Sequence, residues 1–84
     1  MPTISRFYGI VIRMYFQQHE HHLPHIHAIY GEDVASININ TLEVIEGDLP
    51  PVAMRLTTKW IAHNRDQLLE MWKTQQFINI DPLE

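Results

Sequence analysis

The sequence contains no cysteine in its 84 residues. This absence excludes disulfide bonds, and it also excludes zinc or redox chemistry that depends on thiolates. A metal ion would therefore have to be bound by histidine, aspartate or glutamate. A chain without cysteine also suits a reducing cytosol.

Long hydrophobic runs are missing as well. No apolar stretch approaches the roughly 18 residues that a membrane span requires. The N-terminus lacks the charged and then apolar pattern of a signal peptide. We therefore expect a soluble, cytoplasmic protein that has no membrane partner.

Basic residues are few and scattered along the chain. Six Lys and Arg residues against ten Asp and Glu residues give a formal charge of −4 with neutral histidines. Binding to nucleic acid usually depends on neutralisation of phosphates, so this composition argues against autonomous nucleic-acid binding. Folding could still gather Arg6, Arg13 and Arg55 on one side, which leaves nucleic acid open as a partner.

The apolar content that is present suffices for a single domain over residues 1–84. Hydrophobic residues make up 45% of the chain and include two Trp, three Tyr and three Phe, unlike the composition of disordered proteins. A domain of this size buries only about 60 to 65% of its unfolded surface. We therefore expect a homo-oligomer or a partner protein to add buried area.

Four segments have the residue pattern of β-strands. β-Branched and aromatic residues from Ile4 to Phe16 predict one long strand that is covered on both faces. Shorter strands are predicted at residues 25–30, 34–39 and 42–46. The first two of these are expected to pair as a hairpin across Gly31.

One long amphipathic helix is predicted from Val52 to about Gln75, since Pro50 and Pro51 suit a helix start. Its apolar arc contains Ala53, Leu56, Trp60, Ile61, Leu68, Met71 and Trp72. We expect an α+β fold (ββββα), in which this helix covers one face of a small antiparallel sheet of about four strands. The tail from Phe77 to Glu84 is a candidate edge strand.

Two amide side chains, Asn64 and Gln67, fall near the centre of the apolar arc, with His63 beside them. A buried amide without a partner costs about 1 to 3 kcal/mol. We therefore expect a polar spot under the helix, satisfied by the sheet, a ligand or a partner chain. A structural hydrogen-bond network is the simplest form of such a spot.

Five of the six histidines lie within residues 19–27, in the segment HEHHLPHIH. The segment is internal and is interrupted by other residues, so it is not an engineered tag. On a strand, His25 and His27 point to one face and can offer two imidazoles to one metal ion. The candidate third ligand is His63 of the helix, and the loop alternatives are His19, His21 and His22.

Three interpretations of these histidines stay open. A three-histidine site with an open position would suit a divalent metal such as zinc or nickel, although the spacing differs from the helical His-Glu-x-x-His motif. His27 and His63 could instead act as general acid and base on a phosphodiester without a metal. The simplest interpretation is that His25 and His27 make hydrogen bonds at the strand start and that the loop histidines are solvated.

Four stretches resemble one known family when they are taken together. They are MPTISRFYGIVIRMYF, LPHIHAIYGE, INTLEVIEGDLP and the helix that carries Trp60, His63 and Leu68. Over nearly its whole length the chain resembles the small bacterial family catalogued as domain of unknown function 4160. In that family the second strand opens with a Pro-His-aromatic-His pattern. Here Ile26 takes the aromatic position and the preceding loop is richer in histidine, so no role of that loop carries over.

The resemblance implies an association and no reaction. Members are often encoded beside another short protein, in pairs that look like toxin–antitoxin modules. We therefore expect a small interaction protein that binds its neighbour-encoded partner, on the toxin side of the pair because no basic DNA-reading element is visible. The alternative is a histidine-dependent hydrolase or nuclease, with or without a metal, that acts on RNA or a nucleotide.

Overall fold

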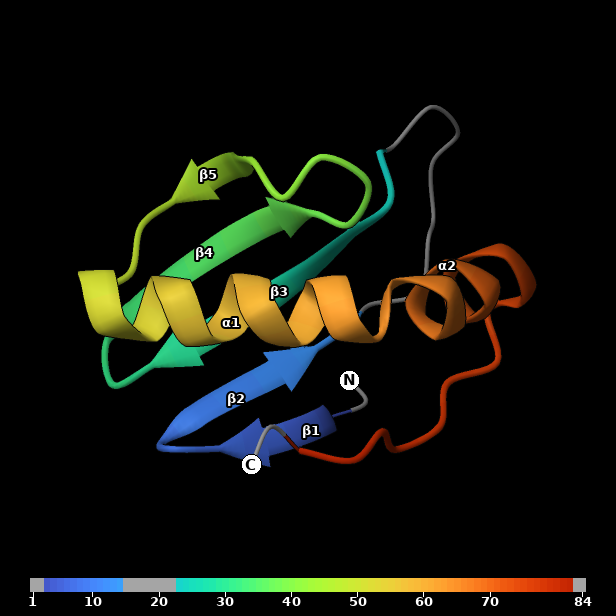
Figure 1. The fold of residues 1–84 in the computed structure, drawn as a ribbon, viewed down its shortest axis with the longest axis horizontal. Coiled ribbons are helices and arrows are strands. Elements are labelled where there is room, and N and C mark those ends of the chain that lie inside the picture. Colours follow the sequence, from blue (N-terminus) through green and yellow to red (C-terminus); the bar gives the residue numbers. More distant parts are fainter. Residues whose placement is uncertain (1–2, 15–22, 83–84) are drawn as a thin grey trace.

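The computed structural model describes residues 3–14 and 23–82, which form five strands followed by two helices (Figure 1). The strands are β1 (Thr3–Phe7), β2 (Ile10–Arg13), β3 (His25–Tyr30), β4 (Asp33–Asn38) and β5 (Val44–Gly47). The helices are α1 (Pro51–His63) and α2 (Arg65–Thr74). The strands pair antiparallel in the order β1-β2-β3-β4-β5. This architecture confirms the expected α+β fold class.

The first predicted strand is divided into a hairpin. Tyr8 and Gly9 have φ values of 50° and 80° and form the turn between β1 and β2. Positive φ at both central residues is the requirement of a type I′ turn, which matches the twist of the flanking strands. The structure thus corrects the prediction of one strand from Ile4 to Phe16. β-Propensity is high on both sides of the turn, and Tyr8 gives no turn signal.

The predicted long helix is divided at Asn64, which has φ −113° and ψ 18°. Its side-chain Nδ2 donates to the Trp60 carbonyl at 2.9 Å, so the amide is satisfied within its own chain segment. Asn competes with helical hydrogen bonds in this way. Gln67 is exposed, so the expected polar spot under the helix is not formed. Neither α1 nor α2 has the length and the apolarity to cross a membrane.

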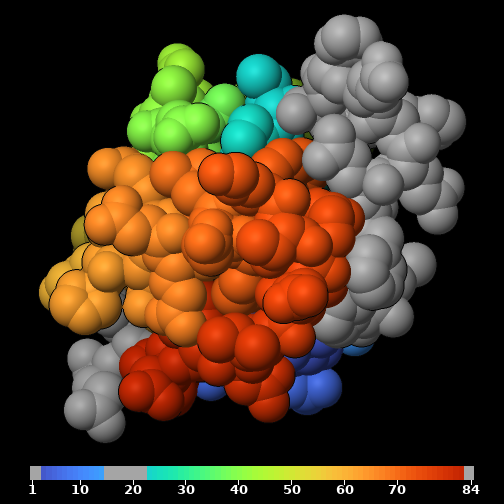
Figure 2. Space-filling view, turned by 90° about the vertical axis from the view of Figure 1, so that its right-hand side faces the viewer, coloured from blue at the N-terminus to red at the C-terminus, as the bar shows by residue number. Residues whose placement is uncertain are grey.

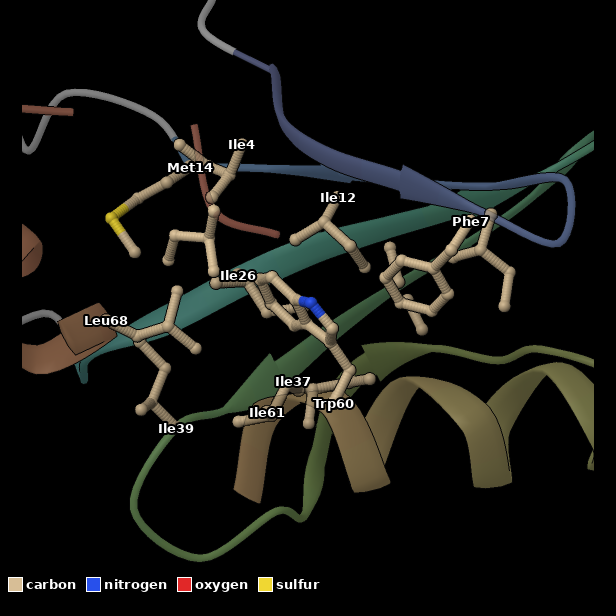
Figure 3. Close-up of a cluster of buried hydrophobic side chains, with 14 of the residues drawn as sticks. Ile4, Phe7, Ile12, Met14, Ile26, Ile37, Ile39, Trp60, Ile61 and Leu68 are labelled. Carbon is tan, nitrogen blue, oxygen red and sulfur yellow. The ribbon is translucent and has the colours of Figure 1, made fainter. Parts of the chain in front are cut away.

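The apolar core lies between the sheet and the helices (Figure 3). Ile12, Ile26 and Ile37, from three neighbouring strands, are fully buried on the side that faces the helices. Trp60 points from α1 toward the strands, and its ring centroid lies 5.7 Å from that of Phe7. As is usual for a buried indole, Nε1 of Trp60 has a polar partner, the carbonyl of Asp81 at 3.0 Å.

The two edges of the sheet, β1 and β5, differ in whether another segment covers them. The C-terminal segment runs alongside β1, and the Ile80 N–H donates to the Ile4 carbonyl at 2.8 Å (Figure 1). Through residue 82 this segment forms no regular strand. In place of the predicted edge strand, the described residues show this one backbone hydrogen bond to β1. At the other edge, β5 is the last strand, and no described element lies beyond it.

Candidate functional site

The face of the sheet opposite the helices carries polar side chains in register across four strands. Arg13 of β2 is paired with His27 of β3. Ser36 of β4 is paired with His27 on one side and with Glu46 of β5 on the other. Directly opposed residues of antiparallel strands point to the same face. The neighbour of His27, Ile26, is buried under the helices, so this polar row of Arg13, His27, Ser36 and Glu46 lies on the helix-free face.

His25 and His27 lie side by side on that face. Their ring centroids are 5.1 Å apart and the rings are nearly perpendicular, at 81°. Nδ1 of His25 is 2.7 Å from the Leu23 carbonyl oxygen. Because a carbonyl only accepts, Nδ1 carries a proton, and Nε2 is the basic atom of the neutral ring. The turn before β3 therefore fixes the tautomer of His25.

Trp72 of α2 packs against the same histidine. The ring centroids of Trp72 and His25 are 5.1 Å apart, with an angle of 57° between the rings. Figure 2 shows the surface of α2 next to the residues at the start of β3. The helical layer thus holds His25 at the end of the sheet, although α1 and α2 pack on its other face.

The histidine pair opens into a hollow of about 340 Å³. The hollow is lined by Leu23, His25, His27, Ser36, Ile45 and Glu46. It combines two imidazoles, a hydroxyl and a carboxylate with apolar side chains at the rim. Such a set can hold a polar ligand through hydrogen bonds and can accept or donate a proton.

Ser36 and Glu46 were not predicted as site residues. They come from β4 and β5, and only the register of the sheet places them beside His27. A signal existed in the alternation of β4, since Ser36 falls on the face opposite to the buried Ala35 and Ile37. For Glu46 there was no comparable signal, because its position depends on an irregular pairing between β4 and β5.

Burial lowers the pKa of His27 below the ordinary value of 6.5. Loss of solvation of the imidazolium is the main cause, the neighbouring His25 lowers the pKa further, and the Glu46 carboxylate acts in the opposite direction. The lowered pKa favours the neutral imidazole of His27 near pH 7. In this form one ring nitrogen can accept a proton or a hydrogen bond.

His63 lies in a different part of the molecule. It is exposed at the end of α1, where it lines a separate hollow of about 1010 Å³ together with Lys59, Asn64 and Asp81. The helix that carries it packs on the face of the sheet opposite to the polar row. The structure therefore brings His25 and His27 together and leaves His63 apart.

No metal cluster is formed by the parts of the chain that the structure describes. Within residues 3–14 and 23–82, no three His, Cys, Asp or Glu side chains are arranged to hold a metal ion. The predicted ligand set of His25, His27 and His63 is thus not assembled in the fold. The loop candidates lie outside the described residues: His19, His21 and His22.

The fold and the site define a small α+β domain in which, among the described residues, both helices cover one face of the sheet and the other face carries a histidine-containing hollow. Residues 9–73 match the family model described as Domain of unknown function (DUF4160), and the chain belongs to this family. The match includes β2 to β5, and therefore the whole polar row. No curated protein and no solved structure matches the chain. The family description names no activity, so the function must be argued from the site.

Proposed function

We propose that this protein is a small cytoplasmic interaction protein that binds a second small protein encoded by a neighbouring gene. Its role would be the toxin side of a toxin–antitoxin-like pair. The observation that carries the proposal is the uneven covering of the sheet. Both helices pack on one face, whereas the other face and the β5 edge keep exposed apolar side chains, such as Val34 at 46% and Ile45 at 47% exposure.

An apolar row on the open face supports the proposal. Val11 of β2 is paired with Ile29 of β3, and Ile29 is paired with Val34 of β4. Val11 and Ile29 are half-buried, and Val34 is exposed. This apolar row lies beside the polar row, and apolar area edged by polar groups is the usual anatomy of a protein interface. A domain of 84 residues also gains much from added buried surface.

The test is co-expression with the product of the adjacent gene, followed by size-exclusion chromatography at micromolar concentration. We expect the two proteins to elute together. Val34→Glu on the open face should separate them, because it places a charge in the apolar row. Val52→Glu is the matched control, since Val52 is also exposed but lies at the start of α1. Separate elution of the unmodified proteins would contradict the proposal.

A second candidate is hydrolysis of RNA or a nucleotide at the hollow of His25 and His27. It is supported by the neutral His27, the basic Nε2 of His25 and the nearby Glu46. His27→Ala and His25→Ala should abolish cleavage and growth inhibition while the urea unfolding curve stays cooperative. His63→Ala should have no effect, because His63 lies apart.

Metal analysis of protein purified without a nickel column would show whether zinc or nickel takes part.

A further inference from the structure

β5 is a short edge strand whose residues are all exposed. It pairs only with β4, and among the described residues no backbone hydrogen bond reaches its outer side. An uncovered edge presents unpaired N–H and C=O groups to any extended chain. The opposite edge differs, because the segment around Ile80 covers β1. Within the described structure, β5 is thus the edge open to a further strand.

The chain around this edge is acidic. Residues 32–48 contain five acidic residues and no Lys, Arg or His, and this range includes β4 and β5. The acidic residues are Glu32, Asp33, Glu43, Glu46 and Asp48, and all five are exposed. All six Lys and Arg residues of the chain fall outside the range, between Arg6 and Arg13 or between Arg55 and Lys73. The formal charges within this range are thus all negative, which favours a basic occupant, and in the described structure the Arg65 guanidinium reaches only its Ile39 carbonyl oxygen, at 3.0 Å.

We infer that β5 accepts an extended, basic segment of the partner protein as a sixth strand of the sheet. This inference rests on the proposed function and specifies which surface the partner occupies. Backbone hydrogen bonds to β5 would supply affinity, as in other cases of strand addition. Val44 and Ile45 offer apolar contacts, and the carboxylates select Lys or Arg side chains on the added strand.

A second copy of this chain fits the edge poorly. Antiparallel pairing of two β5 strands would bring acidic residues of the two copies together, for example Glu43 of one copy opposite Asp48 of the other when Ile45 is paired with Glu46. Like charges placed across a strand pair are destabilising. The same charges repel the phosphates of a nucleic acid. The edge therefore favours a protein segment of opposite charge over either alternative.

The added strand would also border the histidine hollow. Ile45 and Glu46 of β5 line the hollow together with His25 and His27. A basic side chain of the added strand that points to the open face would meet Glu46 there. Binding of the added strand at the β5 edge and binding of a ligand in the hollow would thus be coupled through the Glu46 carboxylate.

The experiment uses the complex with the neighbour-encoded protein. Amide hydrogen exchange of Val44–Gly47 should slow in the complex. The double variant Glu43→Lys and Glu46→Lys should weaken binding by about tenfold or more, because it reverses the charge of the edge. The matched control is Glu70→Lys with Asp81→Lys, which makes the same change of charge at exposed positions of α2 and the C-terminal segment. Its affinity should stay within about twofold.

The outcomes separate the two proposals. A complex that forms with unchanged exchange at β5 and with full affinity of the edge variant would overturn the inference and leave the proposed function standing. The absence of any complex would overturn both. Circular dichroism and urea unfolding of each variant alone would show that it is folded. The exchange measurement on the unmodified chain tests whether the partner covers β5 without any variant.

Discussion

At the scale of single residues, His27 lies in the middle of the polar row. It stands in register between Arg13 and Ser36, beside His25 and near Glu46, and burial disfavours its charged form. A neutral imidazole in this position suits both a hydrogen-bonding interface and proton transfer. The lowered pKa of His27 also links folding to pH.

We expect the free energy of unfolding to fall as the pH drops below 6.5, the ordinary pKa of histidine. The folded-state pKa of His27 lies below 6.5, so the unfolded chain binds the proton first. The loss of unfolding free energy begins as the pH falls below the pKa of His27 in the unfolded chain. It is complete once the pH is below the pKa of His27 in the folded chain. Urea unfolding across this range measures it. His27→Gln should flatten the pH dependence, and His63→Gln is the control for the loss of one histidine; equal slopes of the two variants would contradict the assignment.

Gly47 is required for the attachment of β5 to β4. It has φ +80°, and a Cβ at this position would collide with the Val34 carbonyl oxygen. Gly47→Ala should therefore lower stability by about 2 kcal/mol or more in urea unfolding. Gly31→Ala is the matched control, because Gly31 also has positive φ, at +62°, but a Cβ added there would meet no atom within 4 Å. It should cost only about 1 kcal/mol, the strain of the left-handed conformation; equal losses would mean that the contact with Val34 is unimportant.

At the scale of elements, the two edges of the sheet differ in whether another segment of the chain covers them. The C-terminal segment protects β1, since Ile80 is buried and hydrogen-bonded to Ile4 and the Asp81 carbonyl accepts from Trp60. β5 has no such cover in the described structure. Natural sheets usually shield their edges, and the added strand proposed above would give β5 such a cover.

Two isoleucines of the C-terminal segment test how firmly it is docked. Ile80→Ala removes a buried side chain and should cost about 2 to 4 kcal/mol of unfolding free energy. Ile78→Ala changes a side chain that is 54% exposed and should stay within about 0.5 kcal/mol. Chemical denaturation of the two variants measures the difference. Equal effects would show that the segment is not packed against β1 in solution.

At the scale of the whole molecule, acidic and basic residues are unevenly distributed. The acidic range of residues 32–48 forms the β4–β5 side, and the basic residues lie on the β1–β2 side and on the helices. The helical layer completes the core on one face of the sheet, and the other face keeps the polar and apolar rows. This asymmetry gives the molecule one side that is suited to a basic partner.

The affinity for the neighbour-encoded partner should depend on salt. If acidic side chains at the β5 edge attract the partner, raising NaCl from about 50 to 300 mM should weaken binding several-fold, chiefly through a slower association rate. Surface plasmon resonance at several salt concentrations measures this. The edge variant Glu43→Lys with Glu46→Lys should lose most of the salt dependence. An affinity that is independent of salt would place the contact on the apolar row instead.

The sequence by itself determined the local features of this protein. The alternation of residues 25–30 predicted β3 with its observed bounds and the common face of His25 and His27. Helical periodicity placed Trp60 in the core. These features depend on neighbours within one strand or one helical turn, and the periods of 2 and 3.6 residues record them directly.

Only the tertiary structure decided which distant residues meet. The type I′ turn at Tyr8 and Gly9, the break at Asn64 and the irregular register of β5 set the placement of whole elements. The result is that Glu46 lies beside His27 and that His63 lies on the other side of the sheet. Strand register and the choice of sheet face come from the packing of the entire core, which no local period encodes.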